Sequence, residues 1–212
     1  MSTQTAQDFH SVVKSRHSVR QYDPSVKISK EEMKDILEEA ILAPSSSNLQ
    51  PWRFLVIEQD DLKEKLHPIA FNQDHVLQAS AVIAVLGDLE WYEHAEEIYS
   101  ESVKAGFMTE EVKQRFIATA ENVYRHMDDD RKKSIIYTDG GLISMQLMLS
   151  ARAKGYDTVP MGGYDKVRFQ EEFNIPTHYE SIMLIAIGKA AGPVRPTVRL
   201  PLEKVTFWNK MK

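Results

Sequence analysis

Cysteine is absent from the 212 residues of this chain. Its absence excludes disulfide bonds, thiolate nucleophiles, iron–sulfur clusters and every zinc site built on cysteine. The glycine-rich motifs G-x-G-x-x-G and G-x-x-x-x-G-K-[ST] are also missing, so we expect neither a conventional Rossmann site nor a P-loop. Neither G-x-S-x-G nor H-E-x-x-H occurs, and the seven histidines are scattered, which argues against hydrolases and metalloenzymes. Any chemistry must therefore come from other side chains or from a bound cofactor.

Long hydrophobic runs are absent too. The longest, Ala79 to Gly87, is too short to cross a bilayer, and the N-terminal MSTQTAQDFH lacks the basic flank and apolar run of a signal peptide. We therefore expect a cytoplasmic protein without a membrane partner. Apolar residues make up 42% and charged residues 27%, which is typical of globular proteins, and the length fits a single domain over residues 1–212.

The charge of the chain is unevenly distributed. The formal net charge is −5, which argues against nucleic-acid binding because attraction to phosphates needs a cationic surface. Residues 1–20 nevertheless sum to +2, and residues 189–212 sum to +5. The two basic ends could converge on a small anion, although solvated terminal charges would give the same distribution.

The apolar periodicity predicts an α+β chain. A short helix is expected from about Phe9 to Arg16, and a second begins at the capping box of Ser29 and Glu32 and ends before Pro44. Further helices are expected within 88–133 and over 139–154, and buried strands are expected at 52–57, 81–86 and 182–187. The helix over 139–154 is apolar around most of its circumference, which places it in a central core or a subunit interface. Residues 193–212 are expected to form an arm or an edge strand.

The segment Arg16 to Pro24, with the sequence RHSVRQYDP, concentrates groups that bind anions. If it is extended, Arg16, Ser18 and Arg20 point to one side and span about 13 Å, because side chains alternate along a strand. The guanidinium groups can bind phosphate oxygens bidentately, and the hydroxyl group can donate to another oxygen. By itself the segment is also compatible with two surface arginines beside a turn.

Two further segments could contact a flat heteroaromatic ligand. The loop Pro44 to Trp52, PSSSNLQPW, carries hydroxyl and amide groups that can hydrogen-bond to the edge of a ring. The segment Val159 to Asp165, VPMGGYD, follows a short strand, and its adjacent glycines let backbone N–H groups approach a ligand closely. Taken separately, each is equally compatible with an ordinary loop or turn.

In their order along the chain, these segments resemble one family from end to end. The sequence shows R-H-S-V-R-x-Y-D-P, then P-S-S-S-N-x-Q-P-W, a buried G-G-L helix, P-M-G-G-Y-D and a final V-R-L-P. This pattern is similar to that of the FMN-dependent nitroreductase family. The resemblance implies a three-layer α+β sandwich, with a central, mostly antiparallel sheet flanked by helices. It also implies an intertwined homodimer in which both subunits hold FMN.

The resemblance implies which residues hold the cofactor. Arg16, Ser18 and Arg199 match positions that bind the FMN phosphate and ribityl chain, and Arg20 matches a cation at the pyrimidine edge of the flavin. A fixed cation there would stabilise the negative charge that two-electron reduction places on this edge. His17 is a further cofactor-binding candidate in the first segment, and Pro44, Ser45, Ser46 and Asn48 match the loop that reaches the partner's flavin. Asn72 matches an amide that contacts the ring, and His75 falls where some relatives carry a second cation. The segment near the reactive nitrogen of the flavin is matched by Pro160, Met161, Gly162 and Gly163.

Some of these positions depart from the pattern of some relatives. His75 stands where some carry a second cation, and because histidine is only partly charged at neutral pH its role is open. Gly162 stands where some carry an acid that contacts the nicotinamide, so that contact is not carried over. Thr197 replaces a basic residue, so that Arg199, aided by Arg195, would bind the phosphate.

The helical segment 88–133 falls where the family varies most and can cover the pocket. Its apolar residues form two stripes that Gly106 and Thr109 separate. Six aromatic residues are candidates for substrate contact, although most are expected to be ordinary helix packing: Trp91, Tyr92, Tyr99, Phe107, Phe116 and Tyr124.

The implied activity is a ping-pong NAD(P)H oxidoreduction. NADH or NADPH would pass hydride to the flavin and leave, and a small-molecule acceptor such as a nitroaromatic or a quinone would then take two electrons. The flavin would carry the bond-making chemistry, so we name no catalytic side chain and expect no metal. The alternative is an FMN-binding or sensing protein with little turnover, since a missing nicotinamide contact at Gly162 would not prevent cofactor retention.

Overall fold

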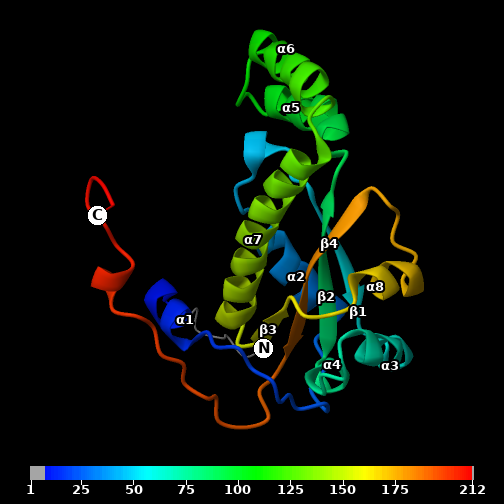
Figure 1. The fold of residues 1–212 in the computed structure, drawn as a ribbon, viewed down its shortest axis with the longest axis vertical. Coiled ribbons are helices and arrows are strands. Elements are labelled where there is room, and N and C mark those ends of the chain that lie inside the picture. Colours follow the sequence, from blue (N-terminus) through cyan, green and yellow to red (C-terminus); the bar gives the residue numbers. More distant parts are fainter. Residues whose placement is uncertain (1–7, 212) are drawn as a thin grey trace.

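An antiparallel sheet forms the middle layer of the protein (Figure 1), whose computed structural model describes residues 8–211. The strand order is β1-β2-β4-β3, so β2 and β4 are central. The bounds are β1 Trp52–Ile57, β2 Ala81–Asp88, β3 Asp157–Met161 and β4 Tyr179–Gly188. Each neighbouring pair is antiparallel, which confirms the expected α+β class and the antiparallel character of the sheet.

Helices cover both faces of the sheet. On one face, α2 (Lys30–Ala40) and α7 (Asp129–Ala153) form a core with the odd-numbered side chains of β2, such as Ile83. On the other face, α3 (Asp60–Ile69), α4 (His75–Gln78) and α8 (Lys166–Glu172) pack against the even-numbered side chains, such as Val82. Successive strand residues point to opposite faces, so both faces of the central strands are buried and the result is three layers.

A helical extension stands at one end of the sandwich, at the top of Figure 1. It contains the 3-10 turn Trp91–His94, α5 (Ala95–Lys104), α6 (Glu110–Thr119) and the π-helical turn Ala120–Tyr124. Gly106 has a φ of 77° and Thr109 caps α6, so these residues do separate two helices as expected. Trp91, Tyr92 and Tyr99 are buried in a core of their own, whereas Phe107 is 87% exposed.

Helix α7 is longer than the sequence pattern predicts, because it begins at Asp129 rather than at Asp139. The Asp128 side chain caps it by accepting a hydrogen bond from the Arg131 N–H at 2.9 Å. The first turns are largely polar, which is why the apolar pattern did not include them. Gly140 lies where α7 meets β4, and a Cβ there would stand only 2.5 Å from Ile182 Cδ1. Gly155, with a φ of 81°, ends the helix as predicted.

Helices α3, α4 and α8 were not predicted. Helices α4 and α8 have only four and seven residues, too few to show a period. Helix α3 does carry apolar residues at helical spacing, Leu62, Leu66 and Ile69, which the sequence-based prediction did not use. The predicted helix over 29–43 is confirmed as α2, with the capping box of Ser29 and Glu32 formed. Strand β1 has the predicted bounds, while β2 and β4 are longer than expected.

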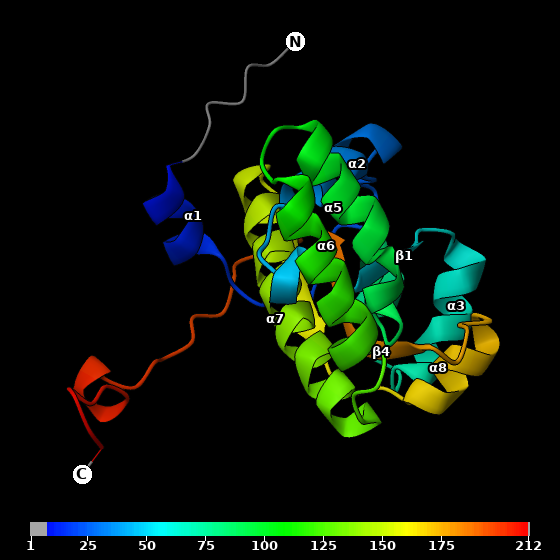
Figure 2. The ribbon, with the colours of Figure 1, turned by 90° about the horizontal axis from the view of Figure 1, so that it is seen from above.

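The two ends of the described chain lie outside the sandwich. Helix α1 (Phe9–Ser15) is capped by Asp8, and residues 191–211 leave the body as an arm with a single 3-10 turn at Leu202–Lys204 (Figure 2). The expectation that the chain has no leader rests on residues that are partly outside the described range. Within residues 8–211, no helix combines the length and the apolar character needed to cross a bilayer.

Candidate functional site

The segment with the sequence RHSVR runs along the edge strand β3. Arg16 ends α1, Ser18 forms a parallel bridge with Thr158, and the Val19 N–H donates to the Thr158 carbonyl at 3.0 Å. Val19 is buried and Arg20 is exposed, but Gln21 is exposed as well, and Arg16, His17 and Ser18 are all half-buried, so the regular alternation of a strand is not formed. Tyr22 is buried and donates through its hydroxyl to the Ala186 carbonyl at 3.1 Å. The segment is therefore pinned to the sheet by single bridges rather than by a full strand.

The loop between α3 and α4 meets the end of β3. Gln73 Nε2 donates to the Gly163 carbonyl at 3.1 Å, and His75 Nε2 lies 3.0 Å from Met161 Sδ. Phe71 and Asn72 adopt φ values of 55° and 56°, in the left-handed region that costs energy for residues with a side chain. The structure thus brings residues 71–75 together with Pro160–Gly163 of the predicted site.

His75 is the buried titratable group at this junction, with 4% of its surface exposed. Burial lowers its pKa below the ordinary value, the positive charge of Arg20 lowers it further, and Asp74 acts in the opposite direction. Histidine is therefore neutral here at neutral pH, and Arg20 is the permanent cation of the pair. His17, half-buried between Arg16 and Ser18, belongs to the same segment as Arg20.

The glycine pair Gly162–Gly163 leaves room above the backbone. Both residues are exposed, and a Cβ at either position would meet no atom within 4 Å. A flat ligand can therefore approach the peptide groups closely at the end of β3. His75 contacts Met161, the residue before this pair, and the charge of Arg20 acts on His75.

The start of the C-terminal arm passes beside the first basic segment. The Ala191 N–H donates to the Gln21 carbonyl at 3.0 Å, and a cavity of about 260 Å³ is lined by Ser18, Arg20, Arg195 and Thr197. Arg199 is exposed and donates to Thr197 Oγ1 at 2.8 Å and to the Val198 carbonyl at 2.9 Å, within the arm. In this chain Arg195 is thus the arm residue beside Arg20, and the role of Arg199 stays a prediction.

The loop with Pro44, Ser45, Ser46 and Asn48 is held rigidly on α7. The Ser46 N–H donates to Asp139 Oδ2 at 2.9 Å, and its hydroxyl group donates to Asp139 Oδ1 at 3.2 Å. Asp139 is buried, and burial raises its pKa above the ordinary value. Tyr99 donates to the Ser47 carbonyl at 2.9 Å, which also ties the loop to the helical extension. Sequence reasoning missed Asp139 as an anchor, because no local motif marks its distant partner.

Within one chain this loop does not join the other site segments. It is anchored at Asp139, whereas Arg152 near the other end of α7 donates through Nε to Ser15 Oγ at 3.0 Å, next to Arg16. Thirteen helical residues separate the two anchors, which corresponds to about 20 Å along the axis. Figure 1 shows the same separation, with α1 and the 3-10 turn Ser46–Asn48 near opposite ends of α7. The structure therefore assembles one half of the predicted site and holds the second half elsewhere.

The fold and site define an α+β protein that offers arginines and an open glycine edge to an anionic, flat ligand. Residues 13–189 match the model of the Nitroreductase family, so the chain belongs to this family and the resemblance is confirmed. It is 51% identical over 204 residues to the Bacillus subtilis protein named "Putative NAD(P)H nitroreductase YdgI", covering 95% of this chain and 98% of that protein.

Solved structures of similar proteins agree with this assignment. A crystal structure titled as a "putative nitroreductase in complex with FMN", from Exiguobacterium sibiricum, has a TM-score of 0.92 and 50% identity, covering 98% of this chain and 100% of that chain. The enone reductase of CLA biosynthesis from Lactiplantibacillus plantarum is 34% identical over 195 residues, covering 91% of this chain and 90% of that protein.

Proposed function

We propose that this protein is an FMN-dependent NAD(P)H oxidoreductase that passes two electrons, by a ping-pong mechanism, to nitroaromatic or quinone-type acceptors. The observation that carries the proposal is the junction of Arg20, His75 and the open Gly162–Gly163 edge beside β3. Similarity to proteins named as NAD(P)H nitroreductases and to a structure that contains FMN supports it.

The residues at the junction fit FMN. Ser18 and Arg195, which line one cavity, would supply a hydroxyl group and charge for the ribityl chain and the phosphate, and the glycine pair leaves a space where a ring can lie against the backbone. The resemblance adds Arg16, two residues before Ser18, as a further phosphate ligand. Asn72, exposed in the same loop as Gln73 and in a left-handed backbone conformation, would offer its amide to the ring. Bound FMN would supply the two-electron redox chemistry.

The chain itself would position the reactants and stabilise charge. Arg20 would supply a permanent cation at the site, which favours a transition state in which negative charge develops. His75, kept neutral by burial, adds hydrogen-bonding capacity rather than charge. We assign the delivery of protons to solvent, and hence no side chain to acid or base catalysis.

A homodimer would complete the site. The 20 Å between the two anchors on α7 supports a loop that serves the flavin of the partner rather than its own. Helix α7 also exposes a stripe at Thr138, Gly141, Leu142 and Met145, whose spacing of three and four residues puts them on one face. An exposed apolar stripe on a long helix is typical of an interface.

The C-terminal arm supports the same assembly. It exposes a series of apolar side chains: Val198, Leu200, Leu202, Val205, Phe207 and Trp208. The free edge of β1 lies beside a groove of about 930 Å³ that α2, β1 and α5 line with Leu37, Ile41, Trp52, Phe54, Ile98 and Phe107. Glu97 and Glu101 also line it, and the arm is basic. We infer that the groove of each subunit receives the arm of the other.

Anaerobic reduction and steady-state turnover test the proposed activity. The purified protein is expected to be yellow, to be bleached by NADH or NADPH without oxygen, and to consume nicotinamide continuously with menadione or a nitrofuran. An enone is a useful additional acceptor, given the similarity to an enone reductase. A single stoichiometric reduction without turnover would favour the FMN-binding or sensing alternative, and a colourless protein that takes up no FMN would overturn both.

A further inference from the structure

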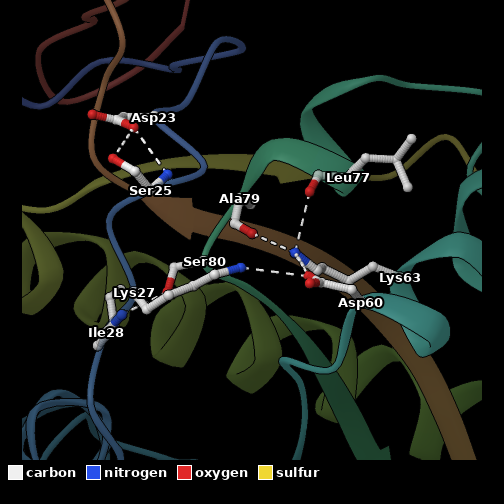
Figure 3. Close-up of polar contacts among 9 residues, drawn as sticks. All are labelled: Asp23, Ser25, Lys27, Ile28, Asp60, Lys63, Leu77, Ala79 and Ser80. Carbon is white, nitrogen blue, oxygen red and sulfur yellow. Dashed lines mark hydrogen bonds and ion pairs between the residues drawn. The ribbon is translucent and has the colours of Figure 1, made fainter.

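Lys63 on α3 is a buried lysine outside the groups discussed above, with 1% of its surface exposed. Its ammonium group has three acceptors: the Ala79 carbonyl at 2.9 Å, the Leu77 carbonyl at 3.1 Å and Asp60 Oδ1 at 2.9 Å (Figure 3). An ammonium group has three N–H donors, so all of them are used. Burying a charge is costly unless it is paired in this way, which makes the arrangement specific rather than incidental.

The two carbonyl groups belong to the end of α4. Leu77 lies within this four-residue helix, and Ala79 is its C-terminal cap. Carbonyl groups at a helix C-terminus lack partners within the helix, and a cation there is favoured by the helix dipole. So short a helix is not stable by itself, which means that its position depends on outside contacts such as this one.

Lys63 also determines the geometry of the loop that enters the site. Helix α3 carries Lys63 and leads directly into residues 70–74, and α4, which follows them, begins with His75. Lys63 therefore joins the helix before the loop to the end of the helix after it. The loop presents Gln73 to the Gly163 carbonyl and His75 to Met161 Sδ, so that any shift of α4 changes the edge on which the ring would lie.

We propose that Lys63 is a positioning residue of the flavin site, which acts by capping α4 and thereby holding Asn72 and His75 in place. The proposal rests on the proposed function, because the site it serves is the FMN site. Lys63 touches neither ring nor substrate, so its effect must appear in cofactor affinity and in the flavin spectrum, not only in stability.

Lys27 provides a matched control. Its Nζ lies 3.4 Å from the same Asp60 Oδ1, but its side chain is 54% exposed (Figure 3). Replacing Lys27 therefore removes a charge near Asp60 and leaves the cap on α4 intact. An effect that is specific to the cap on α4 should therefore appear in the Lys63 variants and not in the Lys27 variant.

The experiment compares the full-length wild type with Lys63→Met, Lys63→Arg and Lys27→Met. FMN affinity is measured by fluorescence titration, and the visible spectrum of the bound flavin and the thermal midpoint are recorded in parallel. Lys63→Met is expected to raise the Kd for FMN on the order of tenfold and to change the spectrum, because small displacements in a preorganised site have large effects. Lys63→Arg should recover part of the loss, and Lys27→Met should resemble the wild type.

Each other outcome counts against the proposal. A Lys63→Met protein that melts earlier but binds FMN with unchanged affinity and spectrum would reduce Lys63 to a purely structural role. If Lys63→Met does not fold, Lys63→Gln takes its place, because the glutamine amide retains a donor for one carbonyl group. The Kd for FMN must then rise, by less than the tenfold expected for Lys63→Met. A wild type that takes up no FMN would overturn the proposed function as well as this inference, whereas an unchanged Lys63 variant would overturn the inference alone.

Discussion

His75 Nε2 lies 3.0 Å from Met161 Sδ and joins the short helix α4 to the end of strand β3. A thioether sulfur can only accept a hydrogen bond, so Nε2 is the nitrogen that carries the hydrogen in this contact. Burial of the ring lowers the pKa of His75 and favours the neutral imidazole. The nearby charge of Arg20 favours the same state. A contact between two uncharged groups thus links the α3–α4 loop to the glycine edge. The permanent positive charge near this contact is that of Arg20.

The pKa of His75 predicts how stability depends on pH. The unfolded chain takes up a proton on this histidine near 6.5, and the folded protein does so only at lower pH. Between these two values the unfolded state binds more protons, so the free energy of unfolding falls as pH falls below about 6.5. Urea unfolding at about pH 7.5 and about pH 5.5 should show a smaller loss for His75→Gln than for the wild type. His126→Gln, at an exposed histidine, is the control for replacing an imidazole by an amide.

Replacement of Arg16 tests the phosphate end of the proposed site. Arg16→Ala is expected to weaken FMN binding by about 1.5–3 kcal/mol, or roughly 10- to 150-fold in Kd, because hydrogen bonds to charged groups are the strong ones. Equilibrium titration with FMN measures the change. Lys14→Ala, at an exposed position of the same helix, serves as the control. Equal affinities of Arg16→Ala and the wild type would remove Arg16 from the site.

Two variants separate the effect of the Asp139 charge on stability from the effect of its hydrogen bonds. Asp139→Ala leaves the Ser46 N–H without its acceptor and is expected to destabilise the fold by about 1–3 kcal/mol. Asp139→Asn retains an acceptor and removes a buried charge whose pKa is raised by desolvation. Ionising a carboxyl group whose pKa is raised in the folded state lowers the free energy of unfolding as the pH rises toward that pKa. Near neutral pH the free energy of unfolding of Asp139→Asn should therefore equal or exceed that of the wild type. Urea titrations that rank Asp139→Asn below Asp139→Ala would contradict this account.

Sharing of the site between subunits predicts complementation. Arg16→Ala and Asn48→Gly are each expected to lose most activity, with glycine chosen because Asn48 has a φ of 54°. In a mixed dimer, one site combines both lesions and the other combines two intact halves. Unfolding and refolding the two variants together should therefore restore activity that neither shows alone.

Sedimentation supplies the control for that experiment. The wild type is expected to be a dimer, and removal of residues 193–212 should favour the monomer, because the groove of each subunit then has no arm to receive. Refolded mixtures without recovered activity would place both halves of the site in one chain. A truncated chain that remains fully dimeric would contradict the role given to the arm.

Local features of the fold were predictable because neighbouring residues decide them. The capping box of Ser29 and Glu32 starts α2, the left-handed Gly155 ends α7, and the apolar run of β2 needs burial on both faces. The start of α7 at Asp129 and the existence of α3, α4 and α8 were missed. The first turns of α7 are polar and α4 and α8 are short, so their stability comes from packing against the rest of the fold, whereas the apolar spacing of α3 was overlooked.

The amino-acid sequence by itself determined the family, the chemical types of the candidate site residues and the order of the main elements, because these follow from motif spacing and apolar period. Only the tertiary structure decided which distant groups meet: Ser46 with Asp139, His75 with Met161, and Lys63 with the end of α4. It also brought Arg20 and Arg195, from opposite ends of the chain, to the lining of one cavity. Such contacts depend on how helices and strands pack in three dimensions, and no spacing along the chain encodes them.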